Sequence, residues 1–597
     1  MNQNERKTVM RRMVLLIAVA ALVMGLYALR LIFLQLVNGD EYKSQATNTT
    51  DYNFTVTAAR GDIVDSTGER IATTTTSYNV VLNKLQMGDE DLDSLLQRLV
   101  ELFEKNGESW TDTLLISQPD AAGNYTFTAR DDSSSDQRQL TTMKENLGLQ
   151  QYATANDVME MLVEKNNLQD LPLRWQRTLA GIHYEMELQA FSNVNNFVMA
   201  ENVSDVTVAT IKENSLSLPG VEIVQTSTRS YEQGDIVPAV LGRVGKITAE
   251  KWKVTDENGQ TTYPLREKGY NMNDMIGVSG LEAVYEDELR GKDGVETITR
   301  SSDGVIVGTA MTTVPEPGHT VQLTVNSDFQ KAVEQALGKN IDMISRAYGT
   351  DGARANAGAV VVLDVHTGEI RAMASLPSYD PTNVAAALED PDSPLINRAL
   401  LPYSVGSTFK VLVAATAIEQ GYADHTHDCP GYIQVEDVIF HCHNLAGHGL
   451  LNMTQALEKS CNPYFVSLIQ LTGGESVAAK AAAIGFGSPL ELADGITASA
   501  GRLPTYEELA VPGQTANFGF GQGYLVATPL QIAQLMATVA NDGAAVTPKL
   551  IAGYTEDGQT ISEYTPTYSP RQVIRESAAL QVQQMMIQVV EEGSGTK

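Results

Sequence analysis

One uncharged apolar segment, Met13–Leu29, constrains the fold of this chain more than any other feature. It continues past Arg30 through four more apolar residues to Leu34, and about 17–25 such residues can cross a bilayer as a helix. The basic residues Arg6, Lys7, Arg11 and Arg12 precede it, and such residues stay on the cytoplasmic side. We therefore expect a cytoplasmic tail over 1–12 and a single transmembrane anchor over 13–34, with the rest of the chain outside the cytoplasm.

A cleaved signal peptide is the alternative for this segment. Its apolar core is usually about 7–15 residues long and precedes a small-residue cleavage site of the A-x-A type. No such site occurs before Asp40, which favours an uncleaved anchor. No second apolar run of comparable length follows, so the chain is expected to cross the membrane once.

The remaining composition is that of a folded protein in water. The chain has 597 residues, of which 43% are hydrophobic and 19% charged, enough for several domains with large cores. Its 42 Lys and Arg residues against 73 Asp and Glu residues give a formal net charge of −31. Because phosphate backbones repel such a chain, nucleic-acid binding is excluded.

The sequence pattern predicts a multidomain α+β protein. Alternating apolar runs and turn residues over 55–72 and 220–326 are typical of β structure, whereas 91–214 is mainly helical in pattern. The cluster Pro315–Gly318 predicts a boundary between a β-rich domain over 35–325 and a mixed α/β domain over 326–597. In the second domain, a helix over 328–344 should precede a hairpin whose strands lie at 358–365 and 370–375.

The segment Gly406–Lys410 (GSTFK) is the sharpest local candidate for a catalytic site. If Ser407 begins a helix, Lys410 lies one turn on and on the same face. A serine hydroxyl becomes a nucleophile when a neighbouring base takes its proton, and a buried amine can be that base. Alone, however, the pattern also fits a helix-capping serine followed by a solvated lysine.

Two further elements follow in the same domain. Ser460-Cys461-Asn462 is an S-x-N element at the end of a predicted helix, and Gly519–Gly523 forms a glycine-rich turn before the helix that begins at Thr528-Pro529. The glycine cluster lacks the strand and the downstream acid of a dinucleotide site. A packed turn is therefore the favoured interpretation of the cluster, and a cofactor site is the alternative.

Together these elements resemble the class B penicillin-binding proteins, in which S-x-x-K and S-x-N elements recur. The resemblance covers nearly the whole chain, because six segments occur in the family's order: Arg60–Ile63, Gly277–Glu282, Gly358–Pro381, Gly406–Lys410, Ser460–Asn462 and Gly521–Gln531. No glycosyltransferase motif of the class A enzymes precedes residue 220. The chain is most similar to the elongation-type penicillin-binding protein 2 group.

The resemblance implies a fold and a set of roles. Residues 35–325 would form a non-catalytic pedestal of the dimerisation type, and 326–597 a transpeptidase domain like the serine β-lactamases. Ser407 would attack the D-Ala carbonyl of a peptidoglycan stem peptide, with Lys410 as its base. Ser460 would pass the proton to the departing D-Ala, and Asn462 would bind the substrate's amide. Gly521, Gln522 and Gly523 would line the substrate site, and β-lactams would acylate the same serine.

The third family motif, K-[ST]-G, occurs nowhere in the sequence, which ends at Gly593–Lys597. The resemblance therefore implies a transpeptidase domain truncated just before the motif strand. That would remove a carboxylate-binding lysine and half of the oxyanion hole. A scaffold of the elongation machinery without catalysis is the alternative function. A β-lactamase is disfavoured by the large N-terminal module.

All three cysteines and five of the eight histidines lie between His425 and Cys461. One hypothesis is a structural Zn²⁺ held by Cys429, Cys442, His448 and Cys461. The other is a Cys429–Cys442 disulfide with Cys461 buried beside it, which an exported location favours. No nucleotide or redox cofactor is expected. By resemblance, the partners would be a membrane glycosyltransferase and elongation scaffold proteins at the outer face of a bacterial cell membrane.

Overall fold

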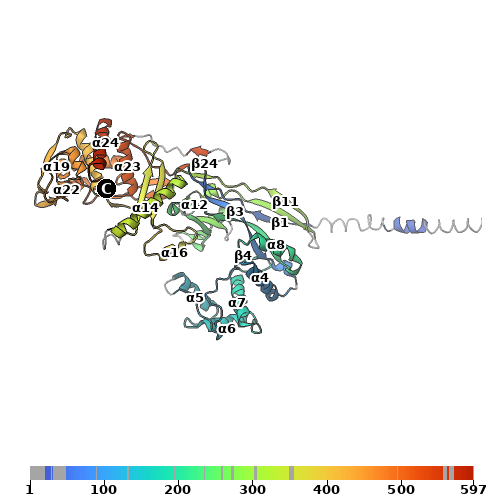
Figure 1. The fold of residues 1–597 in the computed structure, drawn as a ribbon. Coiled ribbons are helices and arrows are strands. Elements are labelled where there is room, and N and C mark those ends of the chain that lie inside the picture. The colour runs from blue at the N-terminus through green and yellow to red at the C-terminus, as the bar shows by residue number, and fades with distance from the viewer. Residues whose placement is uncertain are drawn as a thin grey trace, which may run out of the picture. The chain divides into compact units, whose positions relative to one another are not determined.

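The computed structural model describes residues 21–28, 30, 32, 49–88, 90–130, 134–193, 195–233, 236–256, 260–270, 274–301, 306–347, 355–493, 495–555, 561–563 and 571–595 (Figure 1). The chain forms two compact units, one of residues 1–73 and 231–597 and one of residues 74–230. No helix within the described ranges is long and apolar enough to cross a membrane. Residues 21–28, 30 and 32 of the predicted anchor are helical, and its other positions lie outside these ranges. The division into domains 35–325 and 326–597 stays a prediction.

The unit of residues 74–230 is built mainly from helices, as the pattern over 91–214 predicts: α4 (Leu92–Asn106), α5 (Ser134–Asn146), α6 (Ala155–Lys165), α7 (Leu173–Leu188) and α8 (Asp205–Glu213). Helix α4 begins where the Asp91 side chain accepts a hydrogen bond from the Ser94 amide, and it ends at Gly107 in the left-handed region. Its apolar positions face the core at helical spacing, namely Leu95, Leu96, Leu99, Val100 and Phe103.

A buried ion pair lies inside this unit. Arg177 on α7 is 5% exposed, and its Nη1 atom lies 2.9 Å from Oδ2 of Asp112. The same guanidinium donates to the carbonyls of Ile116 and Leu114 at 2.8 and 2.9 Å. These bonds replace the water that the charge loses on burial.

The β structure predicted near both ends of the first domain is present in the other unit. Strand β12 (Val321–Leu323) pairs in parallel with β2 (Ile63–Val64) and antiparallel with β24 (Ile551–Thr555). Strand β1 (Thr49–Val56) pairs with β10 (Gly294–Ser301), which pairs in turn with β11 (Ile306–Thr313). Segments from both predicted domains thus share one sheet.

The hairpin predicted in the second domain is also present. Helix α14 (Ser327–Ala347) precedes β13 (Gly358–Leu363) and β14 (Ile370–Leu376), which pair antiparallel. Gly368 closes the turn at a φ of 75°, and its amide donates to the Asp364 carbonyl at 2.9 Å. This conformation favours glycine because a Cβ atom would be strained there.

A helical core carries the remaining elements of the second domain. It contains α17 (Lys410–Glu419), α18 (Met453–Glu458), α19 (Asn462–Thr472), α20 (Gly474–Ile484), α22 (Pro512–Gly519), α23 (Pro529–Ala540) and α24 (Glu576–Glu591). Figure 1 shows the labelled α19, α22, α23 and α24 gathered together in orange and red. Buried Phe409, Phe465 and Phe518 belong to one apolar cluster between these helices. The cluster gives Ser407 and its neighbours a rigid base.

Candidate functional site

Ser407 and Lys410 meet at the start of α17. Gly406–Phe409 form a single 3₁₀ turn that runs directly into the helix, and Gly406 takes a φ of 64°. The turn places Nζ of Lys410 3.0 Å from Oγ of Ser407. Ser407 is exposed, whereas Lys410 is fully buried. The solvent-exposed hydroxyl of Ser407 is therefore within hydrogen-bond distance of the buried amine of Lys410.

The S-x-N element reaches the same amine from the other side. Nζ of Lys410 lies 2.8 Å from the Ser460 carbonyl oxygen, 3.0 Å from Oγ of Ser460 and 2.7 Å from Oδ1 of Asn462. Ser460 stands between α18 and α19 with a φ of 49°, in the left-handed region. The structure thus brings together all four residues for which the sequence analysis expects a catalytic role.

The environment of Lys410 suits a base. Burial lowers the pKa of its amine from 10.5 to about 8, although the neighbouring Cys461 and Cys442 oppose this shift. An ammonium has three protons to donate and no lone pair, yet four oxygen atoms surround Nζ. The lowered pKa makes deprotonation accessible just above neutral pH, and a neutral Lys410 could then accept the Ser407 hydroxyl proton while it donates to two of the other oxygens.

The glycine-rich turn packs directly behind the nucleophile. The amide of Gly406 donates to the Gly521 carbonyl at 2.8 Å, and a Cβ atom on Gly521 would lie 1.9 Å from the Gly406 oxygen. Nε2 of Gln522 lies 3.7 Å from the position of a Cβ on Gly406. Gln522 and Gly523 are exposed. The glycine-rich turn therefore supports the serine turn, which is the 3₁₀ turn of Gly406–Phe409, and it presents polar groups beside that turn.

His441 is a neighbour of this group that the sequence did not predict. Nδ2 of Asn462 donates to the His441 carbonyl at 3.3 Å. His441 ends β18 (Val438–His441), far from Asn462 in the sequence. The only local signal was its position in the cysteine- and histidine-rich segment, which pointed to metal binding instead.

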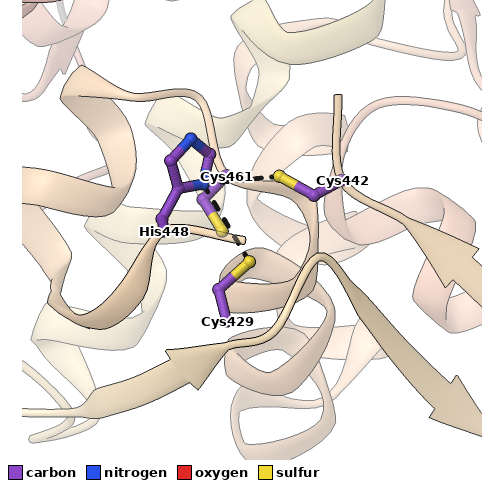
Figure 2. A group of neighbouring side chains, drawn as sticks. All are labelled: Cys429, Cys442, His448 and Cys461. Carbon is purple, nitrogen blue, oxygen red and sulfur yellow. Dashed lines mark hydrogen bonds between the residues drawn. The ribbon is translucent and has the colours of Figure 1, made fainter. Parts of the chain in front are cut away.

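The four predicted metal ligands converge on one point (Figure 2). Their ligand atoms, three Sγ atoms and Nδ1 of His448, all lie within 4.8 Å of one another. Cys429 ends β16 (Thr426–Cys429), Cys442 follows β18, His448 precedes β19 (Gly449–Asn452), and Cys461 caps α19. Nδ1 of His448 lies 3.4 Å from Sγ of Cys442 and 3.9 Å from Sγ of Cys429.

This donor set fits a tetrahedral Zn²⁺. Bonds of about 2.3 Å to sulfur and about 2.0 Å to nitrogen place neighbouring ligand atoms about 3.5–3.8 Å apart, close to the distances observed. The three cysteines are free and buried, so the alternative Cys429–Cys442 disulfide is not formed. Burial raises the pKa of the Cys461 thiol and lowers the pKa of His448. A neutral histidine is ready to bind a metal, and a cation would stabilise the buried thiolates.

Comparisons with known proteins agree with this geometry. The family described as "Penicillin binding protein transpeptidase domain" matches residues 358–597, and "Penicillin-binding Protein dimerisation domain" matches residues 55–323. A solved chain from a study of a peptidoglycan synthase complex has the same fold, with a TM-score of 0.62 and 23% identity over 98% of this chain and 85% of that one.

Curated relatives carry the same kind of name. Peptidoglycan D,D-transpeptidase MrdA of Escherichia coli K12 is 29% identical over 62% of this chain and 58% of its own length, and that of Salmonella typhimurium LT2 is 28% identical over 65% and 62%. Stage V sporulation protein D of Bacillus subtilis is 27% identical over 71% and 61%. The chain thus spans about three-fifths of the length of these relatives. With both domains matched in order, the chain belongs to the class B penicillin-binding proteins.

Proposed function

We propose that this chain is a serine-type peptidoglycan D,D-transpeptidase that β-lactams inhibit. The observation that carries the proposal is the buried Lys410 amine, which lies 3.0 Å from Oγ of both Ser407 and Ser460 and 2.7 Å from Asn462. One amine can thus take a proton from the nucleophile and deliver it to the leaving group. The names of the MrdA relatives support the same reaction.

The proposed reaction has two halves. Ser407 Oγ attacks the D-Ala carbonyl of one stem peptide while Lys410 accepts the hydroxyl proton, and Ser460 passes that proton to the departing D-Ala amine. The resulting ester is attacked by the amine of a second stem peptide, whose proton returns by the same route to restore the serine. The Ser407 amide is proposed as one donor to the developing oxyanion.

Labelling with a fluorescent penicillin tests the proposal. The wild-type chain should form a covalent adduct that persists for many minutes, whereas a Ser407→Ala variant should form none. Rapid loss of the label by hydrolysis would instead indicate a β-lactamase. No label at all would favour the second candidate, a non-catalytic scaffold of the elongation machinery.

We also propose a structural zinc ion at Cys429, Cys442, His448 and Cys461. The support is the set of four ligand atoms within 4.8 Å and the position of Cys461 inside the S-x-N element. When bound, zinc would tie the segments around residues 429, 442 and 448 to the start of α19. Metal analysis of the purified chain should find close to one equivalent of zinc, and less than about a tenth of an equivalent would refute the site.

The location and the partners of the chain are part of the proposal. A single-pass anchor in the bacterial cell membrane, with residues 35–597 outside, rests on the apolar run Met13–Leu29 and the basic residues before it. Protease added to spheroplasts should then digest the C-terminal domain from outside. A membrane glycosyltransferase and elongation scaffold proteins are the proposed partners, since the solved chain of the same fold comes from a peptidoglycan synthase complex. Co-purification of the anchored chain with such a glycosyltransferase tests that pairing.

A further inference from the structure

The hairpin that ends at His441 has two outer edges, and the edge of β18 starts beside Asn462 and Lys410. Strands β17 (Tyr432–Val435) and β18 pair antiparallel, with Tyr432 opposite His441 and Gln434 opposite Ile439. They form a two-stranded sheet, and no other described strand pairs with either. Over the part of the chain that the structure describes, no strand therefore occupies the edge of β18, although Asn462 already donates to its last carbonyl, that of His441.

The register shows which backbone groups point outward from β18. The Cys442 amide donates to the Gly431 carbonyl at 2.9 Å, which makes this pair a hydrogen-bonded one. Since such pairs alternate along an antiparallel ladder, the amide and carbonyl groups of Ile439 and His441 point away from β17. The outward His441 carbonyl is the one that accepts the hydrogen bond from Asn462. The open edge thus continues directly from a residue that contacts Lys410.

Apart from its shortness, this edge lacks the usual protection against pairing. Free edges of soluble proteins commonly carry lysine, proline or a bulge. Strand β18 instead reads Val-Ile-Phe-His and pairs without a register shift. Val438 and Ile439 are 49% and 50% exposed. Such an edge is suited to an extended peptide that adds as a third strand.

The two faces of the hairpin differ in burial: one packs on the protein, and the other is exposed and available to a docked peptide. Val435 and Phe440 are buried in a small cluster with Val466 and Ala516, which anchors one face to α19 and α22. On the other face Tyr432, Gln434, Ile439 and His441 are all exposed. An aromatic ring, an amide and an aliphatic side chain therefore lie beside the open edge, where they can contact the side chains of a docked peptide.

We propose that the β18 edge and this exposed face bind the second stem peptide of the reaction, the one whose amine resolves the acyl-enzyme. The inference rests on the proposed function. A peptide on this edge lies next to Asn462 and hence beside Ser407. The first stem peptide is held by its covalent bond to Ser407, so the second one is the partner that needs a non-covalent site there.

Binding of a labelled stem peptide to the penicillin-acylated chain tests this proposal. The probe is fluorescein-labelled L-Ala-γ-D-Glu-meso-diaminopimelate-D-Ala, and the readout is fluorescence polarisation with the full chain in detergent. The wild-type adduct should bind the probe. Ile439→Pro, which removes an outward amide but no bond to β17, and Tyr432→Ala should each weaken binding at least tenfold. Tyr506→Ala, at a tyrosine that is 58% exposed on another element, should bind like the wild type.

Three results would overturn the proposal: no binding by the wild-type adduct, equal binding by the Ile439→Pro and Tyr432→Ala variants, or binding only before acylation, which would assign the edge to the first stem peptide. Only variants that still accept the fluorescent penicillin are compared, so a failure to fold is not scored as a loss of binding. Failure of the proposed function itself is distinct, since Ser407 would then take no penicillin at all.

Discussion

Oδ1 of Asn462 lies 2.7 Å from Nζ of Lys410, while Nδ2 of the same side chain donates to the His441 carbonyl at 3.3 Å. The amide therefore holds the base on one side and the β17–β18 hairpin on the other. Because the amide group of asparagine is planar, its oxygen and its nitrogen make both bonds in a single orientation of the side chain. The base and the hairpin are thus coupled through one side chain.

Replacement of this amide should slow acylation without unfolding the chain. Loss of a hydrogen bond to a charged or partly charged group costs about 1.5–3 kcal/mol, so Asn462→Ala should lower the acylation rate with fluorescent penicillin by about 10- to 100-fold. Asn340→Ala is the matched control, since Asn340 is an exposed asparagine on α14 that bonds only locally to the Ala336 carbonyl. Equal rates for Asn462→Ala and the wild type would exclude a role for this amide.

Acylation should depend on pH through Lys410. Burial lowers the pKa of its amine to about 8, so the amine is protonated and inactive as a base below that pH. The acylation rate should rise about tenfold per pH unit below pH 8 and level off above it. Stopped-flow labelling between pH 6 and 9.5 measures the profile. Lys410→Arg should be inactive throughout, because a guanidinium stays protonated, and a flat wild-type profile would contradict Lys410 as the base.

Removal of the proposed zinc should destabilise the second domain. His448→Ala removes one of four ligands, and a structural zinc contributes its binding energy to folding. We expect loss of most of the zinc and a fall in Tm of at least about 5 °C in calorimetry. His366→Ala is the control, because His366 is exposed on the turn after β13 and lies outside the four-ligand cluster. An unchanged Tm in the His448→Ala variant would argue against a structural metal.

Gly521 should tolerate no side chain. It has a φ of 79°, and a Cβ atom would lie 1.9 Å from the Gly406 carbonyl oxygen, so Gly521→Ala must push the serine turn away. A displacement of about 1 Å can cost about 100-fold in rate, and we expect a loss of that order in penicillin labelling. Gly523→Ala has a similar φ but no backbone atom in its way, and its loss should be smaller. Equal rates for Gly521→Ala and the wild type would refute this coupling.

The buried ion pair of the 74–230 unit should be costly to break. Asp112→Ala leaves the Arg177 guanidinium buried without its carboxylate, which typically costs about 3–5 kcal/mol. Urea unfolding followed by tryptophan fluorescence should show an earlier transition, since Trp110 and Trp175 lie in this unit. The exposed pair Lys165–Glu187 is the control, and Glu187→Ala should cost less than about 1 kcal/mol. A similar small effect for both variants would contradict the prediction.

Local patterns predicted the parts of the site that lie close together in the sequence. Helical spacing alone placed Lys410 beside Ser407, and the density of cysteine and histidine predicted a group whose ligand atoms do converge. The approach of Ser460 and Asn462 to Lys410 was expected only from the family resemblance, because it depends on how α17 and α19 pack. Periodicity carries no information on such long-range packing.

The long-range pairing of strands was beyond the sequence for the same reason. Strand β12 pairs with β24, so segments on both sides of the predicted boundary at Pro315–Gly318 lie in one compact unit. Residues 74–230 form the other unit. A strand of three residues such as β12 gives no signal of its partner, since pairing is decided by tertiary contacts.

Ser460 holds a left-handed backbone conformation that a residue with a side chain enters at a cost of about 1–2 kcal/mol. Glycine would relieve this cost but would remove the hydroxyl that faces Lys410. Selection for thermal stability alone would therefore drive this position toward glycine, and selection for turnover would drive it back. The tolerance of this fold to heat and its capacity for proton transfer are opposed at a single residue.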